Sequence, residues 1–188
     1  LINRSFGEYD CICTDAAESI RQGLSWLLNE AGHDIAFITS PPSFGQPYVQ
    51  ERSLAFYESC FALGARLLPE LIFKTRYRDF MTDMPLIVEK LFERPNPPKG
   101  IFIPCCDFVV PFVLCATKYR KELGKDYFLL SFDMIPEFLG KQGMTFLRQP
   151  FHLFQLEIKA WLKHCANVHA PSFRKWLKCD MIVGKESN

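Results

Sequence analysis

The segment from Ala31 to Ser40, AGHDIAFITS, constrains the fold of this chain more than any other stretch. An amphipathic stretch ends at Gly32, and a run of four apolar residues, Ile35 to Ile38, follows almost at once. A loop rich in proline and glycine comes next, and a second helical stretch then runs from Tyr48 to Leu63. A buried strand between two helices predicts a β-α-β-α unit of a parallel sheet. Ligands of such sheets bind at the carboxyl ends of the strands.

The helix before this segment carries signals at both of its ends. Asp15 follows a short predicted strand, Cys11 to Thr14, and its carboxylate can accept hydrogen bonds from the free amides of a first helical turn. Glu18 stands at the capping-box position, and Gly32 supplies the left-handed conformation at which many helices end. Between these ends, apolar residues recur at helical spacing and predict the buried face: Ile20, Leu24, Leu27 and Leu28.

The rest of the chain continues this alternation of strands and helices. We expect further strands at 70–74, 100–104, 127–132, 145–147 and 179–183, and further helices at 82–94, 108–123 and 151–165. In helix 82–94 the expected buried face is Leu86, Ile87, Leu91 and Phe92. The fold class is therefore α/β, with a doubly wound parallel sheet. A length of 188 residues suits one domain or two small lobes.

Composition argues against several classes of partner. A net charge of +1 gives no case for direct binding of nucleic acid by this segment. No stretch approaches the roughly 20 apolar residues of a membrane span, and no signal-peptide pattern opens the sequence, so we expect no membrane partner. The 18 phenylalanines predict a Phe-rich core in preference to aromatic stacking on a ligand.

The eight cysteines suit reduced thiols better than disulfides or metal ligands. Cys11-x-Cys13 and the adjacent Cys105 and Cys106 lack the C-x-x-C spacing of zinc sites. The four histidines show no metal-ligand spacing either. We therefore expect a cytoplasmic protein with no metal and no cofactor.

The sequence contains no complete enzymatic motif. The sequence lacks a G-x-S-x-G elbow, a Walker A loop and a G-x-G-x-x-G loop. Cys106, beside Asp107 at a predicted helix start, is the best nucleophile candidate, because a helix N-terminus lowers a thiol pKa. No partner base is identifiable, so we favour a structural or ligand-lining role for Cys106 over a catalytic one.

Three polar residues lie at or beyond the carboxyl ends of predicted strands: Arg52, Asp107 and Asp133. In one parallel sheet these ends converge on one edge. A guanidinium offers a rigid fork of donors and carboxylates accept pairs of hydroxyls, so together they suit a polar small molecule. Each residue also has a structural alternative, since Asp107 could cap a helix and Arg52 could form a surface ion pair.

Seven motifs in register resemble one known family. The first three are Asp15-x-x-x-x-Ile20, Leu27 with Ala31 to Ile38, and Arg52-x-x-Ala55-Phe56; the others are Pro98-x-Gly100-Ile101-Phe102-Ile103 before Asp107, Leu129 to Asp133, Gln149-Pro150, and Met181-Ile182-Val183-x-Lys185-Glu186-Ser187. This pattern resembles the effector-binding core of LacI/GalR-type transcription regulators. The resemblance implies a periplasmic-binding-protein-like domain of two α/β lobes, and it covers nearly the whole chain.

The resemblance also implies a ligand site. Arg52 and Asp133 would contact the effector in the cleft between the lobes, and Asp107 would keep the acid of the family's Asn-Asp pair. Cys106 replaces the asparagine of that pair, and a thiol is a weak hydrogen-bond partner, which argues against an ordinary hexose as the effector. Phe80 lies near a position where the family lines its cleft with an aromatic residue.

By the same comparison, residues 1–33 would finish the N-terminal lobe and residues 34–143 would build most of the C-terminal lobe. Residues 144–170 would return to the first lobe, and residues 171–188 would supply the final strand of the second. The comparison also implies that the DNA-binding headpiece and the first strands of the N-terminal lobe are absent, which fits a start at Leu1 in the middle of a strand.

We therefore expect the chain to be a non-enzymatic sensor that binds a small polar effector, sugar-like or otherwise. We expect it to act as a homodimer and to contact DNA only through the absent headpiece. Three alternatives remain. The same sensor could be fused to a diguanylate cyclase or a kinase, the chain could be an enzyme that uses Cys106, or it could be an extracytoplasmic solute-binding protein.

Overall fold

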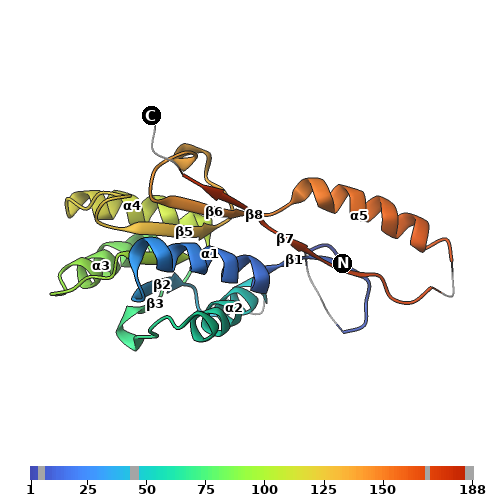
Figure 1. Cartoon of the computed structure of the whole chain (residues 1–188), viewed down its shortest axis with the longest axis horizontal. Coiled ribbons are helices and arrows are strands. Elements are labelled where there is room, and N and C mark those ends of the chain that lie inside the picture. Colours follow the sequence, from blue (N-terminus) through green and yellow to red (C-terminus); the bar gives the residue numbers. More distant parts are fainter. Residues whose placement is uncertain (4–6, 43–46, 168–169, 185–188) are drawn as a thin grey trace.

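The computed structural model describes residues 1–3, 7–42, 47–167 and 170–184. His169 and the Lys185 to Ser187 end of the last motif lie outside these residues. The described chain forms two parts, a larger one built on a six-stranded sheet and a smaller one built on a two-stranded sheet (Figure 1). We call them the large part and the small part.

The sheet of the large part has the order β3-β2-β4-β5-β6-β8. Its strands are β2 (Ile35–Thr39), β3 (Ile72–Lys74), β4 (Gly100–Ile103), β5 (Phe128–Phe132), β6 (Met144–Arg148) and β8 (Asp180–Val183). The first five run parallel, as the sequence predicted, and the edge strand β8 runs antiparallel to β6. An antiparallel edge strand on a parallel sheet is a common variation of doubly wound folds.

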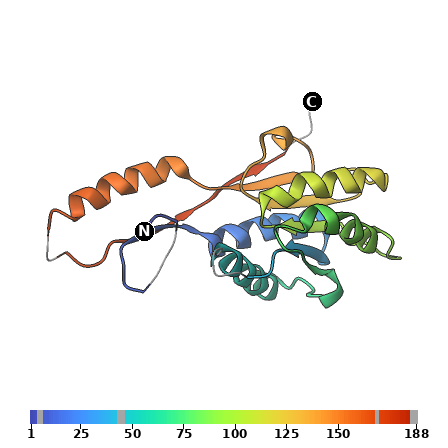
Figure 2. The ribbon, with the colours of Figure 1, turned by 180° about the vertical axis from the view of Figure 1, so that it is seen from behind.

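Two helices cover each face of this sheet (Figures 1 and 2). They are α1 (Ala16–Ala31) and α2 (Pro47–Leu63) on one face, and α3 (Phe80–Phe92) and α4 (Val109–Lys118) on the other. Successive residues of a strand point to opposite faces. In β2, Phe37 therefore packs with the first pair of helices, whereas Ile38 packs with the second pair. Phenylalanine fills both layers, as expected: Phe37, Phe56 and Phe102 on one side, and Phe108, Phe112 and Phe146 on the other.

The small part joins the two ends of the chain. Strand β1 (Cys11–Asp15) pairs in parallel with β7 (Arg174–Lys178), and α5 (Phe151–His164) packs on this pair through a small core of Ile12, Phe154 and Leu177. Residues 1–3 lie along the other edge of β1, where Ile2 bridges Ile12. Helix α5 projects away from the six-stranded sheet (Figures 1 and 2). The sequence prediction missed β7, whose segment RKWLK has only one buried residue, Leu177.

The chain crosses between the parts at three points: after Asp15, at Gln149-Pro150 and at Cys179. These points differ from the expected boundaries. Helix α1, which we placed in the first lobe, packs on the large sheet, because Ile20, Leu24 and Leu27 pack in the same buried cluster as Phe37 and Phe102. Likewise residues 144–148 belong to the large sheet and residues 174–178 to the small one.

Helix ends follow the expected signals with local differences. Asp15 caps α1 by accepting from the amide of Glu18 at 3.0 Å, but the Glu18 carboxylate accepts from Arg21 and Lys178 in place of closing a capping box. In α3 the expected burial of Leu86 is wrong, since this side chain is 57% exposed while Met84 and Val88 are buried.

Helix α4 ends at Lys118, earlier than expected. Two features close it: the amide of Lys121 donates to the carbonyl of Ala116, and Arg120 adopts a left-handed backbone conformation. A left-handed residue that follows the last turn is a common way to end a helix, although glycine usually occupies it.

Candidate functional site

Arg52 lies in the second turn of α2, at the carboxyl edge of the large sheet. Its residue surface is 7% exposed. One terminal nitrogen, Nη1, donates to the carbonyl of Pro104 at 2.6 Å, and the other, Nη2, lies 3.4 Å from Oδ2 of Asp133. The guanidinium carbon also lies 3.7 Å from the ring centre of Phe132. The surface ion pair considered for Arg52 is therefore wrong, because the cation is buried and fixed on three sides.

Asp133 follows directly after β5 and turns back toward Arg52. It adopts a left-handed backbone conformation with φ of 70°, which is uncommon outside glycine but is tolerated by aspartate. Its amide donates to the carbonyl of Leu147 at 2.9 Å, which anchors the turn to β6. The carboxylate remains partly accessible, with 28% of the side-chain surface exposed. Asp133 thus presents a charged group that is positioned and still reachable.

Gln149 completes this group of residues, and the sequence prediction did not select it. Its Nε2 donates to Oδ1 of Asp133 at 2.6 Å. Its Oε1 accepts from Nδ2 of Asn3 at 2.6 Å and from Oγ1 of Thr14 at 3.0 Å. A usable signal did exist, because Gln149 follows the carboxyl end of strand β6, and that rule had already selected Asp107 and Asp133.

Asp107 stands beside a small aromatic cluster. It lies in the single 3-10 turn that follows β4, and the hydroxyl of Tyr77 donates to its Oδ2. Phe80 stacks on Phe108 with ring centres 4.9 Å apart, and the Tyr77 ring lies 5.7 Å from that of Phe80. The hydrogen bond to Asp107 raises the pKa of Tyr77 well above its usual value. The sequence prediction named Asp107 and Phe80 but missed Tyr77, which follows the end of β3.

Helix capping does not account for Asp107. The turn from Cys106 to Phe108 receives no side-chain cap, and α4 beyond it also begins without one. The described hydrogen bonds of the Asp107 carboxylate come from Tyr77 and, more weakly, from the thiol of Cys105 at 3.8 Å. The alternative of a helix cap is therefore wrong, and Asp107 is exposed at the edge of the sheet.

The thiol of Cys106 is held in its neutral form. Burial is the main cause that raises the pKa of Cys106, and the nearby carboxylates of Asp107 and Asp133 add to it. Burial, with help from Asp107, raises the pKa of the neighbouring Cys105 to about 12. The expectation that a helix N-terminus would lower the pKa of Cys106 is wrong, because desolvation and two negative charges disfavour the thiolate.

Tyr48 lies close to both groups of site residues, the one around Arg52 and Asp133 and the one around Asp107. The guanidinium carbon of Arg52 lies 4.9 Å from the ring centre of Tyr48. Burial raises the pKa of the Tyr48 phenol, and Cys105 and Asp107 are close enough to raise it further. The residues that the sequence selected thus gather at one edge of the sheet, around an aromatic surface: Arg52, Asp133, Cys106, Asp107 and Phe80.

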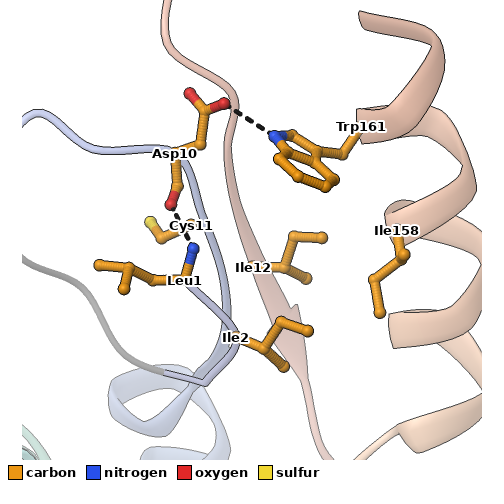
Figure 3. Close-up of a pocket in the computed structure, with 7 residues that line it drawn as sticks. All are labelled: Leu1, Ile2, Asp10, Cys11, Ile12, Ile158 and Trp161. Carbon is orange, nitrogen blue, oxygen red and sulfur yellow. Dashed lines mark hydrogen bonds between the residues drawn. The ribbon is translucent and has the colours of Figure 1, made fainter. Parts of the chain in front are cut away.

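A separate cavity of about 210 Å³ lies in the small part (Figure 3). It is mainly apolar and is lined by Leu1, Ile2, Asp10, Cys11, Ile12, Ile158 and Trp161. The Asp10 carboxylate is already engaged, since it accepts from Nε1 of Trp161 and from the amide of Phe173, both at 2.7 Å. These bonds, the Trp161 bond first, hold the pKa of Asp10 below its usual value. This cavity is distinct from the sheet-edge site and contains none of its residues.

The described part of the chain offers no metal site. Within it, no three His, Cys, Asp or Glu side chains lie close enough together to hold a metal ion. All eight cysteines are free thiols. None of the described helices combines the length and the apolar character needed to cross a bilayer.

Sequence comparison identifies no relative: no protein-family model matches the chain, and no curated protein matches it. Solved structures match it by shape. A LacI family transcription regulator from Clostridium acetobutylicum has a TM-score of 0.75 at 15% identity, over 98% of this chain and 68% of that one. A probable transcription regulator from Thermus thermophilus has a TM-score of 0.76 at 18% identity, over 97% of this chain and 71% of that one.

A third structure is a complex of the transcriptional regulator CelR with cellobiose, with a TM-score of 0.77 at 15% identity. It is matched over 99% of this chain and 57% of that one. The chain thus has the periplasmic-binding-protein-like fold of LacI-type transcription regulators, and it spans 57% to 71% of the length of these three. The fold implied by the sequence resemblance is confirmed.

Proposed function

We propose that this chain is the effector-sensing part of a LacI/GalR-type transcription regulator, and that it binds a small polyhydroxylated molecule at the carboxyl edge of the large sheet. The observation that carries the proposal is the convergence of Arg52, Asp107 and Asp133 on that edge, beside the crossing at Gln149. Ligands of open α/β sheets bind at this edge. The fold shared with LacI-type regulators, one of them in complex with cellobiose, supports the same reading.

The chemistry of the site favours a sugar-like ligand. Carboxylates such as Asp107 and Asp133 accept hydrogen bonds from pairs of hydroxyls, and a fixed guanidinium donates to a ring oxygen or hydroxyl. Tyr77 and Phe80 offer aromatic faces on which the apolar face of a sugar ring can stack. The thiol of Cys106 replaces a stronger hydrogen-bond partner, so we expect the effector to differ from an ordinary hexose.

The mechanism follows from the two-part construction. A ligand that contacts both parts favours the arrangement in which they close on it, and its differential affinity shifts the population toward that arrangement. We propose that the shift reaches DNA through a headpiece outside this chain, in a cytoplasmic homodimer. Fusion to a diguanylate cyclase or a kinase is the alternative output for the same sensor.

A thermal-shift experiment on the chain tests the proposal with named probes: cellobiose, glucose, ribose and adenosine. A true ligand at 100 times its dissociation constant stabilises the folded state by about 2.7 kcal/mol. For a chain of this size that raises Tm by roughly 5–10 °C. If none of the probes raises Tm, the assignment to sugar-like effectors fails.

Two matched variants test whether the ligand binds at Asp107. Asp107→Asn removes the exposed charge of the site without emptying any core position, so we expect it to abolish the shift. Glu30→Gln removes an exposed carboxylate near the end of α1, at the opposite edge of the sheet, and should leave the shift unchanged. Equal shifts in both variants would remove Asp107 from the site.

A further inference from the structure

Gln149 lies at the crossing between the two parts and bonds to both of them. The residue is 9% exposed. On one side its Nε2 donates to Asp133 of the large part, and on the other its Oε1 accepts from Asn3 and Thr14 of the small part. One side chain therefore links the proposed ligand carboxylate to the β1 edge of the small part.

The direction of this amide is determined by its partners. Asn3 Nδ2 and Thr14 Oγ1 both lie within hydrogen-bond distance of the same atom, Oε1, and the Asn3 amide nitrogen is a donor only. The other end of the amide, Nε2, must then point toward Asp133, where it lies 2.6 Å from Oδ1. Within the small part, the amide of Thr14 donates to Oδ1 of Asn3 at 3.1 Å, which fixes which end of the Asn3 amide faces Gln149.

Asp133 depends on this bond for its orientation. It stands in a left-handed backbone conformation at a strand end, and its contact with Arg52 is long, at 3.4 Å. The short bond from Gln149 fixes Oδ1 and so sets which way Oδ2 points. A carboxylate whose rotamer is already fixed loses less conformational entropy when it binds a ligand.

We propose that Gln149 is a positioning residue: it orients the Asp133 carboxylate for ligand and couples that orientation to the placement of β1 and residues 1–3. The proposal rests on the proposed function for its ligand, but the link between the two parts stands on the geometry alone. A ligand that moves the Asp133 carboxylate would displace the small part through the hydrogen-bonded side chain of Gln149. A displacement of the small part would in turn reorient the Asp133 carboxylate.

Gln149→Glu is the decisive variant because it has nearly the same shape. Its carboxylate still accepts from Asn3 and Thr14, but it places an oxygen against Asp133 where a donor stood. Gln155→Glu, at an exposed position of α5, is the matched control for the added charge. The charged groups at the altered position are Asp133 and, beyond it, Arg52, whereas Asn3 and Thr14 are neutral.

Hydrogen exchange of the ligand-free chain, followed by mass spectrometry, tests the link between the parts. With Gln149→Glu we expect about 10- to 100-fold faster exchange in the segment around Asp133, from the loss of a charge-assisted hydrogen bond and the repulsion that replaces it. Gln149→Leu loses the same hydrogen bond without adding repulsion, so we expect a smaller acceleration around Asp133, together with faster exchange in residues 1–3 and 11–14, which lose the acceptor Oε1. Unchanged exchange around Asp133 in both variants would overturn the proposal, whatever binds to the chain.

Binding of the probe that stabilises the wild type in the thermal-shift panel tests the positioning role. Calorimetry should show affinity reduced about 10- to 100-fold in Gln149→Glu and unchanged in Gln155→Glu. In the Gln149→Glu variant, protonation of the introduced carboxylate restores a donor, and the neighbouring Asp133 favours that protonation. Affinity should therefore recover as pH falls from about 8 to about 5.5.

Each outcome of the binding experiment decides one point. Recovery at low pH would tie the loss of affinity to the missing donor at position 149, and the absence of recovery would overturn the positioning role. If no probe binds the wild type, the proposed function fails, while the exchange experiment still decides the role of Gln149.

Discussion

The guanidinium of Arg52 lies against the ring of Phe132, with its central carbon 3.7 Å from the ring centre. Phe132 is the last residue of β5 and Asp133 follows it, so one strand end supplies both the ring and the carboxylate that face this cation. A buried charge is tolerated only when it is paired and hydrogen-bonded. Phe132, Asp133 and the Pro104 carbonyl together meet that need and fix the fork at the edge of the sheet.

This geometry predicts that Arg52→Lys is not a conservative change. A lysine keeps the charge but loses the planar fork that reaches Pro104 and Asp133 at once and stacks on Phe132. We expect the free energy of unfolding to fall by about 1.5–3 kcal/mol, the contribution of a hydrogen bond to a charged group. Urea denaturation followed by circular dichroism measures it.

Ligand affinity gives a second readout for Arg52. Arg52→Lys and Arg52→Ala should both abolish calorimetric binding of the stabilising probe under conditions where each remains folded. Exposed Arg21→Lys, on α1, is the control that alters an arginine away from the site and should bind as the wild type does. Unchanged affinity in a folded Arg52→Ala chain would remove Arg52 from the ligand site.

Thiol reactivity separates the sensor from a cysteine-dependent enzyme. Burial and two carboxylates raise the pKa of Cys106, and burial raises the pKa of Cys60 to about 12, so little thiolate is present at neutral pH. We expect iodoacetamide to modify exposed Cys165 first and Cys106 more slowly, with the Cys106 rate still rising above about pH 9. Peptide mass spectrometry over time measures both, and fastest labelling at Cys106 at neutral pH would favour the enzyme alternative.

Acid should loosen the small part through Asp10. The hydrogen bonds from Trp161 and from the Phe173 amide hold the pKa of Asp10 below its usual value, so they favour the charged form in the folded state. A lowered pKa means that the stabilisation is present at neutral pH and is lost as pH falls through the folded-state pKa, below about 3.9. The protection factors of the α5 amides in hydrogen exchange, which correct for the slower intrinsic exchange at low pH, should therefore fall in acid.

Asp10→Asn isolates this effect. The amide oxygen of asparagine can still accept a hydrogen bond but does not titrate in acid. We expect the α5 amides to be less protected from exchange than in the wild type at neutral pH, and their protection factors to change less between neutral pH and about pH 3. An acid response identical to that of the wild type would show that other carboxylates control the docking of α5.

A glycine pair tests the packing beneath the β5–β6 connection. Gly140 and Gly143 both have φ of 78°, and a Cβ at Gly140 would meet nothing within 4 Å. A Cβ at Gly143 would overlap the backbone of Gly124. Gly140→Ala should therefore cost about 1 kcal/mol of unfolding free energy from backbone strain alone, and Gly143→Ala should cost at least about 2 kcal/mol more. Equal costs in urea denaturation would contradict this close approach of two loops.

Three residues of the site could be predicted because the only information needed was where each strand ends along the chain. Arg52, Asp107 and Asp133 each follow a strand, and parallel strands bring such positions to one edge whatever the order of strands in the sheet. Gln149 and Tyr77 follow strands in the same way. An amide and a phenol are common in loops and carry no charge, so neither stood out in the sequence.

The division into two parts could not be read from the same local patterns. The amphipathic face of α1 shows which residues are buried, namely Ile20, Leu24 and Leu27, but it does not show which sheet covers them. In the structure that partner is the large sheet, and the crossing falls at Asp15. Strand β7 escaped prediction because only one of its residues is buried and its partner, β1, lies near the other end of the sequence.

Local patterns along the chain were enough to predict the α/β class, the position of most strands and helices, and three polar residues at strand ends, because apolar periodicity and end signals act over a few residues. Three other properties follow from the folded structure: Arg52 is buried against Phe132, the pKa of the Cys106 thiol is raised, and Gln149 bonds to both parts. These properties depend on desolvation and on contacts between residues far apart in the chain, and such contacts exist only once the fold has formed.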